Sequence, residues 1–460
     1  PNTRDHGISG SRDREGFNQR ASHRVPVVAA LLAAFLVAFP ISLAAQPSAA
    51  PLSPDGAAAL VEETFSLIRD HALTAPDSTA VLTAAVAAAT QALSAAGIVP
   101  PAAPALTATA ADLPVVRDYI RAAAVLIQSR PLDSFVALVL RAMVRESRDP
   151  LGAIFLPADF SRFVALLRGE RGGVGLQVDA LPEGIVVVEL VDGGPAARGG
   201  VLVGDRLADV DGVAVADRTP DEVIELLGGR VGTTVMLTLI RGGQTLRASL
   251  TRAQVRAIPI RARLIEPRVG YIRLLEFSEG AAGDLARALG RLVAQGAAAV
   301  LLDLRDNGGG LVDESIAIAS HFLPPGLVAI EERRAGPLML LVQPVSPKFA
   351  GPVAVLVNTG SASASEIVAG ALQDVRTPLV GMRTFGKGTV QTIFTLEGEW
   401  GLRLTTGRYR TRAGRAVDGV GLQPDVVVPM ADDQVQGPND VQLAAALQLV
   451  RSRLRSARVP

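Results

Sequence analysis

The sequence of 460 residues contains no cysteine, only four histidines, and aromatic residues at 4% of the total. The absence of cysteine excludes disulfide bonds, thiolate metal sites and a cysteine nucleophile. The histidines lack the spacing of a zinc motif such as His-Glu-x-x-His, so we expect no metal and no cofactor; they are His6, His23, His71 and His321. Any nucleophilic catalysis must therefore use Ser, Thr, Asp or Lys.

The chain also lacks an excess of charge of either sign. It carries 45 Lys+Arg against 45 Asp+Glu, so the chain as a whole has no electrostatic attraction to nucleic acid. An apolar fraction of 49% and a charged fraction of 20% are typical of a globular protein. At about 150 residues per domain, the length allows roughly three domains and excludes a lone small binding module.

Residues 1–46 have the composition of an export segment. Residues 1–24 are polar and rich in arginine, and the apolar run Val25–Ala45 follows them. The run ends in small residues, which predicts a signal peptide cleaved near Ala44 or Ala45; the alternative is an uncleaved membrane anchor formed by residues 25–45. Both interpretations predict an exported protein, in the periplasm or the cell envelope.

The rest of the chain changes texture three times. Residues 57–168 are rich in Ala and Leu at helical spacing, which predicts helical packing. Residues 172–256 consist of short β-branched runs with Gly turns, interrupted by one helix near 220–227. Strands alternate with helices over residues 257–430, and residues 431–460 predict a helical tail.

Continuous apolar runs mark the strands of the third region. They are Val269–Leu275, Ala298–Leu304 and Val353–Val357, with helical stretches at 279–294 and 311–322 between them. Alternating strands and helices with uninterrupted apolar strands predict an α/β core whose sheet is buried on both faces.

A serine cluster follows the last of these strands. The strand breaks at Asn358-Thr359-Gly360 and restarts as a helix after Ser361-Ala362-Ser363-Ala364-Ser365-Glu366. A serine at such a junction lies beside free helix N–H groups that can stabilise an oxyanion, which suits a nucleophile. The alternative is a capping box, in which Ser363 only caps the helix and Glu366 completes the box.

A lysine between two glycines, Gly386-Lys387-Gly388, could act as the base for a serine once its amine is neutral. The alternative is a solvated lysine at a turn. Gly381 to Lys387 also imitates a nucleotide-binding phosphate loop, but that loop needs Ser or Thr directly after the lysine and then a helix. Gly388 follows instead, and Thr389–Leu396 is predicted to be a strand, which argues against nucleotide hydrolysis.

The predicted strand Ala298–Leu304 is followed by the glycine turn Asn307-Gly308-Gly309-Gly310. Glycines let backbone N–H groups approach a ligand closely, as an oxyanion hole requires. A plain turn between a strand and a helix is the alternative interpretation.

Taken in order, these clusters resemble the carboxy-terminal processing protease family, also called tail-specific proteases. The resemblance covers about residues 145–430 and has three departures: Gly308 replaces the proline of the usual Leu-Arg-x-Asn-Pro-Gly-Gly, and the segment between Asp374 and Lys387 is one residue shorter than usual. The third is the helical region 57–145, which matches the family poorly and is longer than expected, so we expect it to hold a surface for a homo-oligomer or a regulatory partner. The resemblance rests on the segments Gly172–Val178, Gly194–Ala197, Gly204–Leu207, Leu304–Gly309, Ser361–Ile367, Gly386–Gln391 and Gly419–Asp425. The family implies a crotonase-like ββα-type protease core with an inserted PDZ-like β domain and an N-terminal helical region.

The resemblance also implies residue roles. Ser363 would be the nucleophile, Lys387 its general base and Gln391 the residue that orients the lysine. The backbone N–H groups of Ala364 and Gly309 would form the oxyanion hole. The implied activity is that of a serine endopeptidase that cuts near the carboxy termini of exported proteins without a metal.

The PDZ-like domain, residues 172–256, would bind the substrate's free carboxy terminus on the backbone of Gly173, Val174, Gly175 and Leu176, with Arg206 as a sensor of the chain end. The partners are therefore protein or peptide substrates with free carboxy termini. Two other functions remain open from the residues alone. One is a catalytically silent scaffold that binds protein tails, and the other is an acyl-CoA enzyme that uses the glycine turn.

Overall fold

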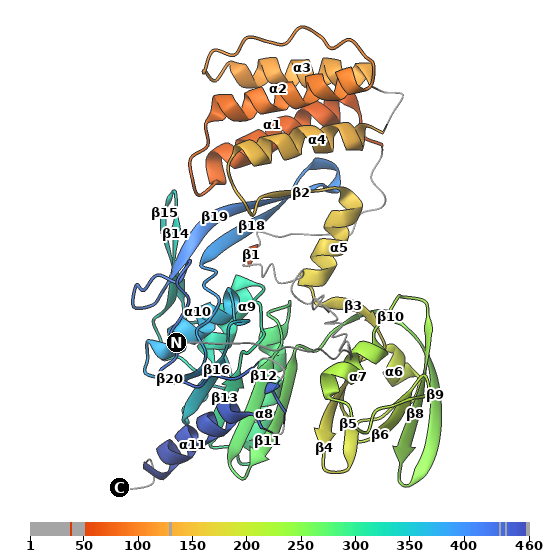
Figure 1. The fold of residues 1–460 in the computed structure, drawn as a ribbon, viewed down its shortest axis with the longest axis vertical. Helices are drawn as coiled ribbons and strands as arrows, with labels where there is room; N and C mark the ends of the chain where they lie inside the picture. Colours follow the sequence, from red (N-terminus) through yellow and green to blue (C-terminus); the bar gives the residue numbers. More distant parts are fainter. Residues whose placement is uncertain (1–36, 39–50, 128–130, 432–433, 438, 457–460) are drawn as a thin grey trace, which may run out of the picture. The chain divides into compact units, whose positions relative to one another are not determined.

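The computed structural model describes residues 37–38, 51–127, 131–431, 434–437 and 439–456 (Figure 1). The predicted signal peptide or anchor, residues 1–46, lies outside the described residues except for strand β1 (Val37–Ala38), which pairs in parallel with β18 (Thr389–Thr395).

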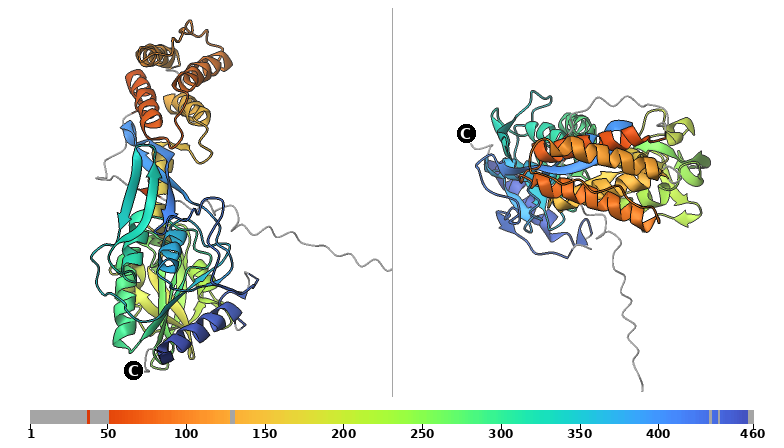
Figure 2. Two further views of the ribbon diagram at one scale, coloured as in Figure 1. Left: turned by 90° about the vertical axis from the view of Figure 1, so that its left-hand side faces the viewer. Right: turned by 90° about the horizontal axis from the view of Figure 1, so that it is seen from above.

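Four helices form the first part of the described chain: α1 (Pro54–His71), α2 (Ser78–Ala95), α3 (Asp112–Leu126) and α4 (Leu132–Glu146). Their apolar faces pack on one another around a common core, and the left view of Figure 2 shows the four helices grouped together. Ser53 and Asp77 cap α1 and α2 by accepting hydrogen bonds from backbone N–H groups. Helix α2 is long and apolar enough to cross a membrane, but its residues Val81, Leu82, Ala85, Val86, Ala89 and Leu93 are buried in this core.

One segment of the predicted helical region, residues 57–168, forms a strand. Between α4 and α5 (Pro157–Leu167) the chain forms strand β2 (Ala153–Phe155), which pairs antiparallel with β19 (Gly401–Thr411). A three-residue strand leaves almost no periodic signal in a sequence, and its partner lies about 250 residues away. The pairing places the segment after α4 directly against β19.

The predicted β region folds into two sheets and two short helices. Strand β3 (Glu170–Gly173) pairs with β10 (Ala253–Arg256), and a separate sheet has the order β4-β5-β6-β8-β9 with β7 beside β6. The helix expected at 220–227 is confirmed as α7, which begins with a capping box formed by Thr219 and Glu222. The remaining elements are β4 (Leu176–Leu181), β5 (Gly184–Leu190), α6 (Pro195–Arg198), β6 (Arg206–Val210), β7 (Val213–Ala214), α7 (Pro220–Leu227), β8 (Thr234–Arg241) and β9 (Gln244–Thr251).

The predicted α/β core is present as a six-stranded sheet of order β11-β12-β13-β16-β17-β20, parallel except for β11. Its strands are β11 (Ile260–Glu266), β12 (Val269–Leu274), β13 (Ala299–Asp303), β16 (Val353–Val357), β17 (Leu379–Gly381) and β20 (Val426–Val427). Alternate residues of the strands pack against α8 (Ala281–Ala294), α9 (Val312–Ser320) and α10 (Ala364–Gln373) on one face and α11 (Val441–Ser456) on the other. Burial on both faces explains the continuous apolar runs.

A second six-stranded sheet carries the lysine cluster. Its order is β1-β18-β19-β14-β15, with β2 beside β19; β14 is Leu327–Arg333 and β15 is Gly336–Leu341. A short 3₁₀ turn, η2 (Glu397–Glu399), joins β18 to β19. The even-numbered residues Leu402 and Leu404 of β19 pack into the core of α1–α4, so this sheet connects the helical region with the lysine cluster.

A buried ion cluster attaches the C-terminal helix to the central sheet. The guanidinium of Arg305 is fully buried and pairs with Asp303 at 2.6 Å and with Asp440, just before α11, at 2.8 Å. Its Nη1 also donates to Oε1 of Gln442 at 3.1 Å. Because Arg305 follows β13, these bonds fix both α11 and the start of the glycine turn.

We expect Arg305→Met to lower the free energy of unfolding by about 3–5 kcal/mol, because it leaves two buried carboxylates without their cation. The matched control is Arg451→Met on α11, which removes a half-exposed ion pair with Glu266 and should cost less than about 1 kcal/mol. Urea unfolding followed by circular dichroism measures both. Equal losses for the two variants would contradict the role of Arg305.

Candidate active site

Two turns meet where the neighbouring parallel strands β13 and β16 end. Asp303 pairs in register with Leu356, and the carboxyl ends of parallel strands lie at one edge of a sheet. The turn after β13 contains Gly309, and the turn after β16 contains Ser363. A Cβ atom placed on Gly309 would lie 2.6 Å from Cβ of Ser363, so only glycine fits at position 309.

Ser363 has a strained backbone. Its φ is 64° and its ψ is −119°, a combination that residues other than glycine rarely adopt. Two buried groups hold it there: the carboxylate of Glu366 accepts its N–H at 2.9 Å, and the hydroxyl of Tyr409 donates to its carbonyl oxygen at 3.1 Å. The strain presents the serine side chain at the N-terminus of α10.

The hydroxyl groups of the three alternating serines differ in their bonds. Ser361 Oγ donates to the carbonyl of Leu304 at 2.8 Å, and Ser365 Oγ donates to the carbonyl of Asn307 at 2.8 Å. Ser363 Oγ is buried and has no hydrogen-bond partner among the described residues. Its hydroxyl therefore makes no capping bond, and the capping-box interpretation holds only for Glu366 and the Ser363 N–H.

Glu366 joins the serine turn to the lysine turn. Its buried carboxylate accepts the N–H groups of Ser363, Gly386 and Lys387 at 2.8–2.9 Å and the hydroxyl of Thr384 at 2.5 Å. Burial raises the pKa of Glu366 above its usual value, and these four donors oppose that rise. One side chain thus fixes the backbone of both candidate catalytic residues.

Lys387 lies in a site that favours its neutral amine. Burial, and then the positive charge of Arg403 on β19, lower the pKa of Lys387 to about 8, although the carboxylate of Glu366 opposes the change. At pH 7 about one amine in ten is then neutral, roughly a hundredfold or more above an ordinary lysine. Lys387 is only partly exposed, which argues against the interpretation of Lys387 as a solvated lysine at a turn.

Gln391 lies on β18, four residues after Lys387, and is fully buried. Its Nε2 donates to Thr389 Oγ1 at 3.1 Å and to Thr405 Oγ1 at 3.4 Å. Its Oε1 is buried and has no hydrogen-bond partner in the described part of the chain. The amide therefore has a buried acceptor that no described residue uses.

The two expected oxyanion donors are in different states. No hydrogen bond of the Ala364 N–H, at the start of α10, is seen among the described residues. The Gly309 N–H, in contrast, donates to Oδ1 of Asn307 at 2.9 Å. Gly309 can therefore donate to an oxyanion only after it releases Asn307.

A cavity of about 500 Å³ lies beside the free edge of β4. Gly173, Val174, Gly175 and Leu176 line it together with Ile224 and Leu227 of α7. Arg206 does not line this cavity, since it lies on β6 opposite Ile240. The structure thus brings four of the five expected peptide-binding residues together and leaves Arg206 apart.

The described residues contain no group of three or more His, Asp or Glu side chains that could hold a metal ion. The lysine turn is followed by strand β18 and not by a helix, so it lacks the helix N-terminus that a phosphate loop needs.

Comparison with known proteins identifies the family of this chain. The family model described as peptidase family S41 matches residues 268–428, and the PDZ domain model matches residues 172–251. The carboxyl-terminal-processing protease of Synechocystis sp. is 35% identical over 68% of this chain and 76% of its own length. The chain belongs to peptidase family S41.

Further S41 relatives extend the comparison. The chloroplastic carboxyl-terminal-processing peptidase 2 of Arabidopsis thaliana is 36% identical over 64% of this chain. The chain spans 60% of the length of that relative. Among solved structures, the photosystem II D1 C-terminal processing protease matches with a TM-score of 0.45 and 27% identity, covering 83% of this chain and 98% of that one.

Sequence patterns did not reveal three residues of this S41 site. Tyr409 and Arg403 come from β19, and Glu366 was assigned only to a cap. The chain has only two lysines among its 45 basic residues, which draws attention to Lys348 and Lys387 but does not distinguish between them.

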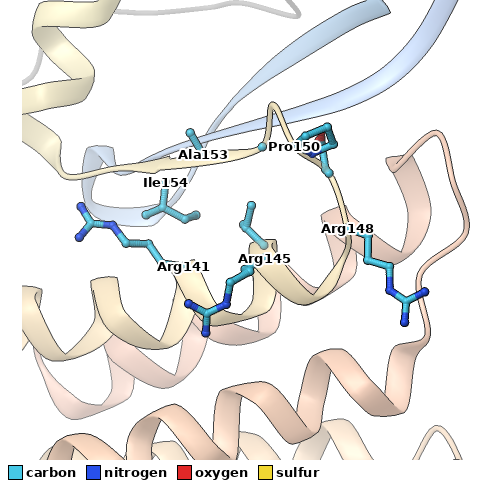
Figure 3. A pocket seen from close by; sticks show the side chains of 9 residues that line it. Arg141, Arg145, Arg148, Pro150, Ala153 and Ile154 are labelled. Carbon is cyan, nitrogen blue, oxygen red and sulfur yellow. The ribbon is translucent and has the colours of Figure 1, made fainter.

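A second cavity, of about 610 Å³, lies at the end of α4. Arg141, Arg145 and Arg148 line it, and Figure 3 shows their guanidinium groups pointing in different directions. The three guanidinium groups do not converge on one point, so they do not form a binding site for an anion. The cavity also contains Asp149, whose carboxylate contacts β19.

Proposed function

We propose that this chain is a serine endopeptidase that cuts near the carboxy termini of exported proteins with a Ser363–Lys387 dyad. The observation that carries the proposal is the contrast among the three serines. Ser361 and Ser365 use their hydroxyls in structural hydrogen bonds, whereas the buried hydroxyl of Ser363 is left without a partner on a strained backbone. Unsatisfied buried groups and strain concentrate at functional sites because they cost stability.

In the proposed mechanism, the neutral amine of Lys387 takes the proton of Ser363 Oγ as the oxygen attacks the peptide carbonyl. The Ala364 N–H, and Gly309 once it is released from Asn307, stabilise the oxyanion. The lysine then gives its proton to the leaving amine, and an acyl-enzyme on Ser363 remains. Water, deprotonated by the same lysine, hydrolyses the ester. Ser363 Oγ has no hydrogen-bond partner among the described residues, so catalysis requires the amine to approach it.

Substrate recognition is proposed to use the free edge of β4. An extended tail would add as a strand there, and the backbone N–H groups of the Gly173–Leu176 turn would bind its carboxylate. The apolar side chains of Ile224 and Leu227 favour an apolar last residue. The proposed domain division follows: 57–168 helical, 172–256 PDZ-like, 257–430 protease core and 431–460 tail. Export of the mature protein remains part of this proposal.

The test is cleavage of an unstructured protein with an apolar carboxy-terminal residue. We expect new internal ends in the products by mass spectrometry, and covalent labelling of Ser363 by a serine-directed phosphonate. If the chain bound the tail but gave neither cleavage fragments nor labelled Ser363, the peptidase proposal would be rejected in favour of a scaffold that binds protein tails.

Amidation of the tail should lower kcat/KM by roughly 10–100-fold, because hydrogen bonds to a charged group are worth about 1.5–3 kcal/mol. The comparison uses one peptide with a free or an amidated end, and competition with a short free-tail peptide serves as the control. Equal rates for both forms would reject tail recognition while leaving the endopeptidase intact.

A further inference from the structure

Thr405 pairs with Gln391 in the β18–β19 ladder, but its backbone N–H and carbonyl bind residues of the helical region. The pairing changes register between Val390 and Gln391, so β19 bulges at Thr406 beside Thr405, the residue opposite Gln391. The Thr405 N–H donates to Asp149 at 2.6 Å, and its carbonyl accepts the Leu73 N–H at 2.8 Å. Both backbone groups of Thr405 are thus fixed by segments that follow α4 and α1.

Asp149 also binds the side chain of Thr405. Its Oδ1 accepts the Thr405 hydroxyl at 2.8 Å and the Leu151 N–H at 3.0 Å. The Leu151 carbonyl in turn accepts Nε of Arg403 at 2.8 Å. The segment after α4 is therefore held against the odd-numbered face of β19, which carries Arg403 and Thr405.

The direction of one hydrogen follows from these bonds. A hydroxyl has a single hydrogen, and Thr405 donates it to the Asp149 carboxylate, which can only accept. Thr405 Oγ1 can then only accept from Gln391, so the glutamine must present its NH₂ group to Thr405. The carbonyl oxygen of Gln391 is directed away from Thr405 and is the buried acceptor without a partner among the described residues.

We propose that Asp149 is a positioning residue for the dyad: through the Thr405 hydroxyl it fixes the Gln391 amide with its carbonyl oxygen turned to hold an N–H of Lys387. The lone pair of the amine then faces Ser363. This inference rests on the proposed function and goes beyond it, because it makes the end of the helical region part of the catalytic arrangement.

Asp149→Asn is the decisive variant because it keeps the shape and reverses the polarity. An asparagine has one acceptor oxygen for the three donors that the carboxylate binds, namely the Thr405 N–H, the Thr405 hydroxyl and the Leu151 N–H. With its oxygen on the Thr405 N–H, its NH₂ would donate to Thr405 Oγ1, whose hydrogen would then point to Gln391. The glutamine amide would have to flip and present NH₂ to the lysine. We expect kcat/KM to fall by about tenfold or more, the value of one misdirected hydrogen bond.

Asp112→Asn is the matched control. Asp112, in the helical region, also accepts the N–H and the hydroxyl of one threonine, Thr107, at 2.9 Å each. It should lose stability similarly and keep its activity within about twofold, because no bond from it leads toward the dyad. Thr405→Val should reproduce the loss of Asp149→Asn, and Thr405→Ser should restore the activity. Combining Asp149→Asn with Thr405→Val should cost little more than either alone.

The pH profile separates positioning from loosening of the fold. Arg403 on β19 and Glu366 on α10 act on the charge of Lys387, Asp149 acts on the charge of Arg403, and Asp418 accepts the Gly388 N–H. Thr405→Val leaves all four in place, so a positioning loss lowers the plateau of kcat without raising the pH of the rising limb. A loosened, wetter site would move that limb toward the ordinary value of lysine.

Full activity of Thr405→Val, or equal losses for Asp149→Asn and Asp112→Asn, would overturn the proposal. Wild-type activity and its loss in Ser363→Ala, measured in parallel, show that the assay reports the dyad. An inactive wild-type chain would instead contradict the proposed function itself.

Discussion

Ser363→Ala is expected to lower kcat/KM for tail cleavage by at least about 10⁴-fold. The variant removes the atom that forms the acyl-enzyme, and residues that act as one catalytic unit cannot replace each other. Binding of a free-tail peptide should stay within about twofold, because the cavity beside β4 does not include Ser363. Cleavage kinetics and fluorescence anisotropy of a labelled peptide measure the two quantities.

The same variant should become slightly more stable. The hydroxyl of Ser363 is buried without a partner among the described residues, and removing such a group relieves a desolvation cost of about 1–3 kcal/mol. We therefore expect the free energy of unfolding to rise by about 1 kcal/mol. Loss of activity together with a gain in stability excludes unfolding as the cause.

Ser361→Ala is the matched control within the same motif. Its hydroxyl donates to Leu304 and accepts the Asn358 N–H at 3.0 Å, so it should lose about 1–2 kcal/mol of stability and keep activity within about tenfold. If Ser363→Ala cleaved at the wild-type rate and Ser361→Ala were inactive, the assignment of Ser363 as the nucleophile would be wrong.

The strands of the core could be predicted because burial on both faces requires a continuous run of apolar residues. β16 is confirmed residue for residue at Val353–Val357, since parallel strands under helices need uninterrupted apolar side chains. β2 could not be predicted, because three residues become a strand only through pairing with distant β19. Local pattern decides the first case and a long-range partner decides the second.

The same division holds for the candidate site. Ser363 and Lys387 stand in short motifs whose order is readable, and the structure places both on the carboxylate of Glu366. The hydrogen bond from Gly309 to Asn307, which occupies the expected oxyanion donor, depends on a side-chain rotamer and leaves no trace in the sequence. Tyr409 likewise reaches Ser363 across 46 residues, so only the folded chain reveals the contact.

Lys387→Arg should abolish cleavage as completely as Lys387→Met, a loss of about 10³-fold or more in kcat/KM. Arginine keeps the positive charge but cannot lose its proton in a protein, so a shared loss shows that the neutral amine is the active form. The control is Lys348→Arg, because the only other lysine donates to the carbonyls of Ser320 and Leu323. That variant should remain active.

The wild-type chain should become more active as the pH rises, with the limb of kcat/KM centred near the pKa of Lys387, about 8. About a tenth of the amines are neutral at pH 7 and about nine tenths at pH 9. Arg403→Gln should move this limb to higher pH, because removing a neighbouring positive charge makes the ammonium form less unfavourable. Initial rates between pH 6 and pH 10 measure the shift.

The lowered pKa of Lys387 also means that the charged lysine destabilises the folded state, so the effects of a substitution on catalysis and on folding can be told apart. The folded state disfavours the ammonium, so it bears the full cost of burying the charge below pH 8, and the cost vanishes as the pH rises through 10.5, the ordinary value. Lys387→Met removes that cost and should raise the free energy of unfolding at pH 7 by about 1–3 kcal/mol, with the gain shrinking between pH 8 and pH 10.5. A stable, inactive Lys387→Met chain assigns the lysine to the chemistry. An active one would leave Ser363 without its base and the Ser/Lys mechanism without support.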